Sequence, residues 1–124
     1  MKLEEVSNAN PKTENIRVLD IAHALSNICR YGGHCTRFYS VAQHSVFCSK
    51  QLGTPLEQME FLMHDASEAY LIDLPRLIKR GMPMYREIED NLLYVIFKHF
   101  GFNSLNGAEK LKPYSENIFS LAEY

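Results

Sequence analysis

Hydrophobic residues recur at helical spacing near the start of the chain. Between positions 18 and 29 they follow an i, i+3, i+4, i+7 pattern, which places them on one face of a helix. These positions are Val18, Ile21, Ala22, Leu25, Ile28 and Cys29. Because Gly32-Gly33 follows this stretch, the pattern predicts an amphipathic helix that stops at the glycine pair.

Two further helices are predicted in the middle of the chain. One begins at Ser40 and ends at Gly53, with Val41, Ala42, Val46 and Leu52 pointing one way. The next begins at Thr54-Pro55-Leu56-Glu57, which combines an N-cap threonine, a proline at the first helical position and a glutamate that closes a capping box. This helix is expected to run to about Leu71, and Asp73-Leu74-Pro75 breaks it.

The last part of the chain continues the helical pattern. Arg76 to Arg80 can add one turn, and a long helix is expected from about Met84 to Phe100, ending at Gly101. Residues 103–113 are typical of a loop, and a final helix is expected from about Tyr114. No segment alternates between polar and apolar residues for long, so the sequence predicts an all-α bundle of five or six helices.

The length of 124 residues corresponds to one domain. Residues 1–15 contain several Asn residues and a proline, and they are expected to form an extended arm ahead of a single domain at 16–124. The last apolar stripe has barely begun when the sequence reaches Tyr124. The domain is therefore expected to be either minimal or shortened at its C-terminus.

Composition and charge exclude several classes of protein. Hydrophobic residues make up 46% of the chain, and 15 acidic against 13 basic residues leave a net charge of -2. This balance argues against sequence-independent binding to nucleic acid, and no stable nucleic-acid partner is expected. No apolar run reaches the roughly 18–20 residues that cross a bilayer. The polar N-terminus and three cysteines without CxxC spacing indicate reduced thiols and a cytoplasmic location.

The adjacent pair His64-Asp65 lies in the middle of an apolar stretch. Burying an ionised carboxylate there is costly unless it is paired or binds a metal. Glu68 follows at helical spacing, and Asp73 lies just beyond the expected helix end. A buried His–Asp hydrogen bond next to a solvated stripe is the alternative, and spacing alone does not decide between the two.

His44 lies on the preceding helix and favours the metal interpretation. The Gly53-Thr54 turn should make the two helices antiparallel, with His44 about two turns before it and His64 about two turns after it. The two imidazoles are then expected to face each other at similar depth. Imidazole, carboxylate and water suit Mn, Fe, Co, Ni or Zn better than calcium.

At this point the sequence resembles a known family, the HD-domain phosphohydrolases. The similarity extends over about residues 16–124 and is carried by three strings. They are Arg30-Tyr31-Gly32-Gly33-His34, Phe38-Tyr39-Ser40-Val41-Ala42-Gln43-His44-Ser45, and His64-Asp65-Ala66-Ser67-Glu68-Ala69-Tyr70-Leu71-Ile72-Asp73-Leu74-Pro75. Together they resemble the branch that contains bacterial 5'-deoxynucleotidases and phage-type deoxynucleotide hydrolases.

The resemblance implies a compact HD-domain bundle and a divalent metal ion (Mn, Co, Zn, Fe or Mg) held by His44, His64 and Asp65. Glu68 would take a proton from the attacking water or orient it, and Asp73 would help to orient water or the leaving group. Such a metal polarises a phosphoryl oxygen and lowers the pKa of water.

The resemblance also implies residues that contact the nucleotide. Arg30 matches an arginine placed near the substrate phosphate, and its planar guanidinium suits that task. Tyr31 lies where related enzymes carry an aromatic residue near the nucleotide. Lys79 could add positive charge for the phosphate, or it could be a solvated helix end. His34 could face the phosphate or cap a turn.

The sequence departs from the family pattern at the fourth metal ligand, an Asp on a late helix. No Asp follows Asp90, and Glu116 stands in the matching region. A glutamate can bind metal, but its reach differs by one methylene, and the groups that orient it would have to change. The metal site could then be rearranged, weakened or completed by a second chain in a homo-oligomer.

Three functions are consistent with these features. The first is metal-dependent hydrolysis of deoxynucleotides, either as monophosphates or as triphosphates. The second is a catalytically weakened HD protein that binds a nucleotide or a partner, which the missing Asp favours. The third is hydrolysis of cyclic dinucleotides or guanosine tetraphosphate, and Arg30-Tyr31-Gly32-Gly33-His34 favours the nucleotidase branch over it. The first is the expected function.

Overall fold

The computed structural model describes residues 13–51 and 53–102, and this part of the chain is all-α. It contains six α-helices, in agreement with the expected number, and two short 3-10 helices. In chain order they are η1 (Thr13–Asn15), α2 (Val18–Asn27), η2 (Arg30–Gly33), α3 (Val41–Ser49), α4 (Pro55–Leu62), α5 (Glu68–Leu71), α6 (Arg76–Lys79) and α7 (Pro83–His99).

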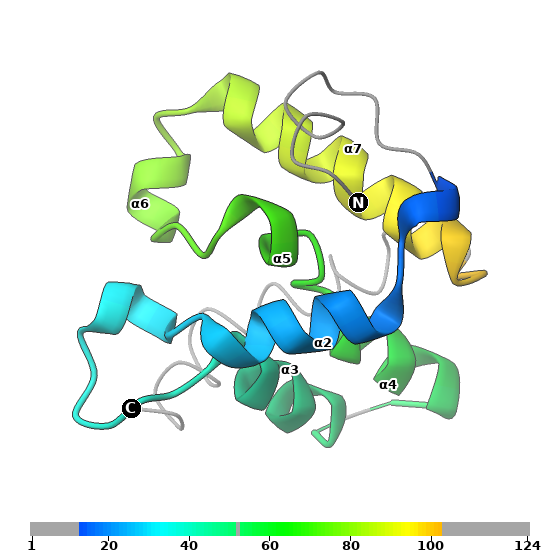
Figure 1. Ribbon diagram of the computed structural model, residues 1–124, viewed down its shortest axis with the longest axis horizontal. Helices are drawn as coiled ribbons and strands as arrows, with labels where there is room; N and C mark the ends of the chain where they lie inside the picture. The colour runs from blue at the N-terminus through cyan, green and yellow to red at the C-terminus, as the bar shows by residue number, and fades with distance from the viewer. Residues whose placement is uncertain (1–12, 52, 103–124) are drawn as a thin grey trace.

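Helix α2 runs through the middle of the molecule, with α3 and α4 on one side and α5, α6 and α7 on the other (Figure 1). The main core lies between these layers, where burial of apolar side chains supplies most of the stabilisation. Its buried members are Ile16, Ile21, Leu25, Val41, Met63, Ala66, Leu92, Leu93, Ile96 and Phe97. A smaller cluster of Cys48 and Phe61 lies between α3 and α4.

Two helix starts agree with the sequence prediction and have a clear physical cause. Ser40 caps α3, since its side chain accepts a hydrogen bond from the Gln43 backbone N–H while the Gln43 side chain accepts one from the Ser40 N–H. Thr54 and Glu57 make the same reciprocal pair at α4. Each box satisfies N–H groups that the first helical turn leaves without a partner.

The prediction of one helix from Thr54 to Leu71 is wrong. Helix α4 ends at Leu62, residues 63–67 form turns, and α5 begins at Glu68. In this interval the Ala66 N–H bonds to the Met63 carbonyl at 3.0 Å, a tighter pattern than that of an α-helix. The His64 side chain competes for the Phe61 carbonyl, which an unbroken helix would use for its own backbone. His64 and Asp65 therefore lie on a turn between two helices.

The buried face of α3 also differs from the prediction. Val41 is buried as expected, but Val46 is 43% exposed, and the face that packs inward carries His44, Ser45 and Cys48. On α2 the expected Ala22 is exposed, whereas Ile21 and Leu25 are buried. An apolar pattern does not reveal the buried face of α3, because His44 and Ser45 on that face are polar.

The segment between α2 and α3 is held at its base by backbone hydrogen bonds. The Val41 N–H bonds to the Ile28 carbonyl at 2.9 Å, and the Arg30 N–H bonds to the Tyr39 carbonyl at 2.8 Å. Inside this closed segment, Tyr31 adopts a φ of 59°, a left-handed conformation that a non-glycine residue rarely takes. Such strain persists where the surrounding structure fixes it.

Several expectations fall outside the described residues. They are the greater part of the N-terminal arm, the side chain of Leu52, the loop at 103–113, the final helix from Tyr114 and the candidate ligand Glu116. Among the helices that the structure describes, none is long and apolar enough to span a membrane.

Candidate metal centre

Three side chains from two segments of the chain converge on one point. His44 Nε2, on α3, lies 3.3 Å from His64 Nε2 and 3.2 Å from Asp65 Oδ2. The third side of this triangle, from His64 Nε2 to Asp65 Oδ2, measures 3.1 Å. Helix α3 and the turn after α4 thus bring the two imidazoles together, as the tight turn between the helices predicts, with ring centroids 5.2 Å apart and ring planes tilted by 57°.

This triangle has the dimensions of a metal-binding site. Ligand atoms about 2.0–2.1 Å from a shared ion, at tetrahedral or octahedral angles, lie about 2.9–3.4 Å from one another. All three sides fall in that range. Two imidazoles and a carboxylate suit Zn, Mn, Fe or Co, so the residues present fit the divalent ion that the sequence implies.

The His64 ring is oriented for this role by the backbone. Its Nδ1 lies 2.5 Å from the Phe61 carbonyl oxygen, which can only accept a hydrogen bond. His64 therefore carries a hydrogen on Nδ1, and Nε2 is the ring nitrogen that faces the centre. A carbonyl that fixes the tautomer of a ligating histidine is a common feature of metal sites.

The His44 ring has a different neighbour on its outer nitrogen. Arg30 Nη1 lies 2.6 Å from His44 Nδ1. A guanidinium has donors only, so it must donate, and Nδ1 must accept. His44 is 2% exposed, so this contact is shielded from solvent.

Asp65 supplies the negative charge of the centre. Burial disfavours its ionised form, but the charge of His64 and hydrogen bonds from His44 and His64 outweigh burial. The pKa of Asp65 consequently lies well below its usual value. Asp65 is therefore ionised at neutral pH and available to a cation.

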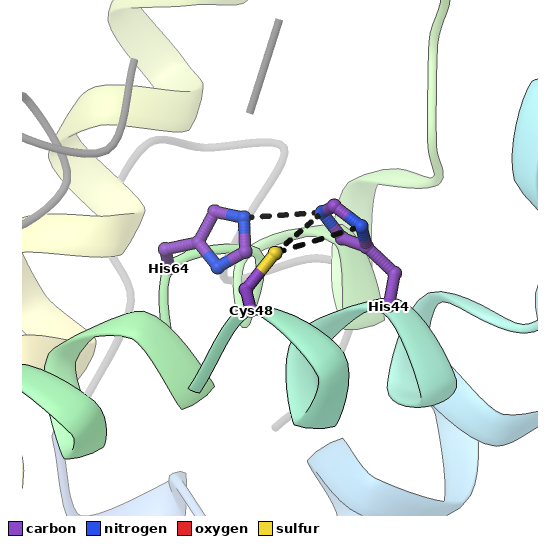
Figure 2. A group of neighbouring side chains, drawn as sticks. All are labelled: His44, Cys48 and His64. Carbon is purple, nitrogen blue, oxygen red and sulfur yellow. Dashed lines mark hydrogen bonds between the residues drawn. The ribbon is translucent and has the colours of Figure 1, made fainter. Parts of the chain in front are cut away.

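Cys48 is a candidate ligand that the sequence interpretation missed. It is fully buried one turn after His44, and the ligand atoms of His44, Cys48 and His64 all lie within 4.8 Å of one another (Figure 2). Its Sγ is 3.7 Å from both ring nitrogens of His44. This equal separation places the sulfur beside the ring, whereas Asp65 Oδ2 lies close to both Nε2 atoms. The i, i+4 spacing of His44 and Cys48 on one helix was the available signal.

Glu68 lies at the start of α5 and is buried. Burial, and then the charges of Asp65 and Asp73, raise the pKa of Glu68 well above its usual value, and Lys79 offsets this only in part. Glu68 Oε2 has no hydrogen-bond partner among the described residues. A buried carboxylate oxygen of this kind is costly for the fold and is frequent at functional sites.

Lys79 is not the solvated helix end that was one alternative. Its Nζ lies 2.9 Å from Glu89 Oε2 on α7 and 3.8 Å from Glu68 Oε1. Burial alone would lower the pKa of Lys79, but the hydrogen bond and charge of Glu89, together with Glu68, raise it. The ammonium is thus paired with two carboxylates, one of which is Glu68.

Asp73 follows α5 and is half-buried. Burial and the charge of Asp65 raise the pKa of Asp73, while Arg30, Lys79 and His44 lower it. The charges of Asp65, Arg30, Lys79 and His44 therefore all act on Asp73, and its predicted role stays a prediction.

The residues expected to contact substrate divide into two groups. The guanidinium of Arg30 stacks over the Tyr31 ring at 4.7 Å, beside the metal centre. An open cavity of about 330 Å³ lies next to them, with walls that include Tyr31, Phe38, Tyr39 and Gln43. His34 is exposed, and its backbone N–H closes the turn with the Tyr31 carbonyl, so the structure places it at a turn end.

Comparison with known proteins adds relatives but no activity. The chain is 49% identical over 88 residues to the uncharacterized protein YfdR of Escherichia coli, an alignment that covers 71% of this chain and 49% of YfdR. It is 30% identical over 101 residues to an uncharacterized protein of Rhodobacter capsulatus, covering 74% of this chain and 52% of that protein. The chain thus spans about half the length of the curated relatives it matches. No protein-family model matches it.

Proposed function

We propose that the protein is a metal-dependent phosphohydrolase of the HD type that acts on deoxynucleotides. The observation that carries the proposal is the triangle of His44 Nε2, His64 Nε2 and Asp65 Oδ2, with sides of 3.1–3.3 Å. A divalent metal held by these atoms supplies Lewis-acid polarisation of a phosphoryl oxygen and acidifies water. The remaining residues of the site have roles of their own.

Glu68 is the proposed general base. A base works best when its pKa approaches the operating pH, and burial raises the pKa of Glu68 in that direction. Its Oε2 has no hydrogen-bond partner among the described residues and can accept a proton from a water molecule. The other oxygen, Oε1, is paired with Lys79, whose ammonium is held by a second ion pair with Glu89.

Arg30 is the proposed phosphate ligand, since its donors lie beside the metal centre and suit a phosphate oxygen. The adjacent cavity, with aromatic walls from Tyr31, Phe38 and Tyr39, offers a place for the nucleoside. Monophosphate and triphosphate substrates both remain compatible with this arrangement, and both are included in the test.

The test is a product assay with the purified full chain. Each deoxynucleoside monophosphate and triphosphate is incubated with Mn²⁺ or Co²⁺, the products are resolved by anion-exchange chromatography, and His64→Ala serves as the blank. We expect nucleoside to form with the wild type only, and the substrate that yields it distinguishes nucleotidase from triphosphate hydrolase activity. No turnover with any metal would contradict the proposal and favour the nucleotide-binding alternative.

A further inference from the structure

The contact between Arg30 and His44 determines where the His44 ring carries its hydrogen. Arg30 Nη1 lies 2.6 Å from His44 Nδ1 and can only donate. If His44 carried a hydrogen on Nδ1, that N–H and the Arg30 Nη1–H would repel each other, because neither could accept a hydrogen bond. The hydrogen of His44 is therefore on Nε2, where Asp65 Oδ2 accepts it at 3.2 Å.

A metal ion requires the opposite arrangement. It binds the lone pair of Nε2, so the hydrogen of a neutral His44 must then be on Nδ1. His64 already has this arrangement, because its Nδ1–H donates to the Phe61 carbonyl. The two imidazoles of the site thus differ at Nδ1. The Phe61 carbonyl favours a hydrogen on His64 Nδ1, as metal binding requires, whereas the Arg30 guanidinium disfavours a hydrogen on His44 Nδ1.

We propose that Arg30 and a divalent cation exclude each other at His44. When the cation binds, the Nε2 hydrogen is lost to water and Nδ1 takes one up, so the proton count of the ring is unchanged. The guanidinium loses its acceptor and its donors become available to an oxyanion, the phosphate of a substrate. Metal binding therefore precedes productive binding of the phosphate by Arg30. This inference rests on the proposed function, because it concerns the same metal centre.

Two further observations favour this exchange. Arg30 lies at the N-terminal side of the η2 turn and stacks on Tyr31, so its guanidinium has a second surface to rest on when it leaves His44. Its charge also lowers the pKa of Asp73, so the guanidinium and that carboxylate attract each other. Neither interaction involves the His44 ring.

The first test observes the tautomers directly in the ¹⁵N-labelled wild-type chain. Long-range ¹H–¹⁵N correlation spectra distinguish a protonated ring nitrogen from an unprotonated one, and His44→Gln assigns the His44 signals. We expect Nε2–H in metal-free His44 and Nδ1–H after addition of Zn²⁺. His64 is the internal reference, with Nδ1–H in both states.

The second test measures the affinity for Zn²⁺ by competition with a chelating dye. Arg30→Met removes the donor and is expected to tighten binding about tenfold, the order of one charge-assisted hydrogen bond. Lys79→Met is the matched control, since it removes another cation that acts on Asp65 without touching His44. Its gain in affinity should be clearly smaller.

The outcomes separate this inference from the proposed function. Nδ1–H in metal-free wild-type His44, or an Arg30→Met affinity no tighter than that of Lys79→Met, would show that the exchange is wrong. Turnover by the wild type would still support the hydrolase in that case. If the wild type binds no divalent metal, both proposals are wrong. The tautomer measurement needs no variant at Arg30, so it decides the matter even where Arg30→Met does not fold.

Discussion

Glu68 is buried, and one of its oxygens has no hydrogen-bond partner among the described residues. We expect Glu68→Gln to lower turnover about 10²–10⁴-fold, the usual contribution of a general base, and to leave metal affinity nearly unchanged. Initial rates with saturating Mn²⁺, together with a metal titration, check this. The exposed Glu87→Gln on α7 is the matched control and should retain activity. A Glu68→Gln enzyme with the wild-type rate would contradict the role as base.

His64 is the proposed metal ligand whose ring is fixed by a backbone carbonyl. His64→Ala removes one corner of the triangle and should abolish stoichiometric metal binding and turnover together, because two protein ligands hold a divalent ion far less tightly. Metal content after gel filtration, measured by atomic emission, checks this. His34→Ala, at an exposed turn, should keep both properties. Retention of the metal by His64→Ala would move the site to other residues.

At the scale of elements, the start of α3 links stability to the site. Ser40→Ala removes the N-cap and leaves the Gln43 N–H without its side-chain acceptor, which should cost about 1 kcal/mol in the free energy of unfolding. Thr54→Ala removes the equivalent cap from α4 and is the control. Urea unfolding should show losses of similar order in both. Only Ser40→Ala should also weaken metal binding, since His44 lies one turn further along α3.

Several elements show how far the sequence could predict this structure. Both capping boxes follow from local spacing, as does the meeting of His44 and His64 across a tight turn. The break at residues 63–67 could not be predicted, because the apolar pattern continues through it. The hydrogen bond between the His64 side chain and the Phe61 carbonyl, which accompanies the break, leaves no mark on that pattern. The Arg30–His44 contact depends on an irregular loop with a left-handed Tyr31, and the Lys79–Glu89 pair depends on packing of α6 beside α7. The spacing of residues along the sequence predicts neither of these two contacts.

For the whole molecule, the raised pKa of Glu68 makes stability depend on pH. An unfolded glutamate ionises as the pH rises through its usual value of 4.5, whereas folded Glu68 keeps its proton to a higher pH. As the pH rises above 4.5, ionisation of this glutamate favours the unfolded state, and the free energy of unfolding falls. Asp65 acts in the opposite sense, since its lowered pKa stabilises the fold until acid protonates it.

The metal-free Glu68→Gln variant should consequently unfold at a higher temperature than the wild type at neutral pH. The difference should shrink as the pH falls below 4.5, where both states of the wild type are protonated at this position. Thermal unfolding in the presence of a chelator, at both pH values, checks this. Equal unfolding temperatures at neutral pH would show that Glu68 is not a source of instability. A residue that limits stability while supporting turnover is typical of active sites.

The closed segment between α2 and α3 has a consequence for how this site could be inherited or transplanted. Hydrogen bonds between Ile28 and Val41, and between Arg30 and Tyr39, tie the segment to itself. These bonds fix the backbone of Arg30 relative to the start of α3, the helix that carries His44. A graft of residues 28–48 onto another helical scaffold should bring the guanidinium and the imidazole together as a pair. His64 and Asp65 would have to be supplied by the recipient. Arg30 and His44 would thus be transferred together, and the recipient would add the other two residues of the proposed metal centre.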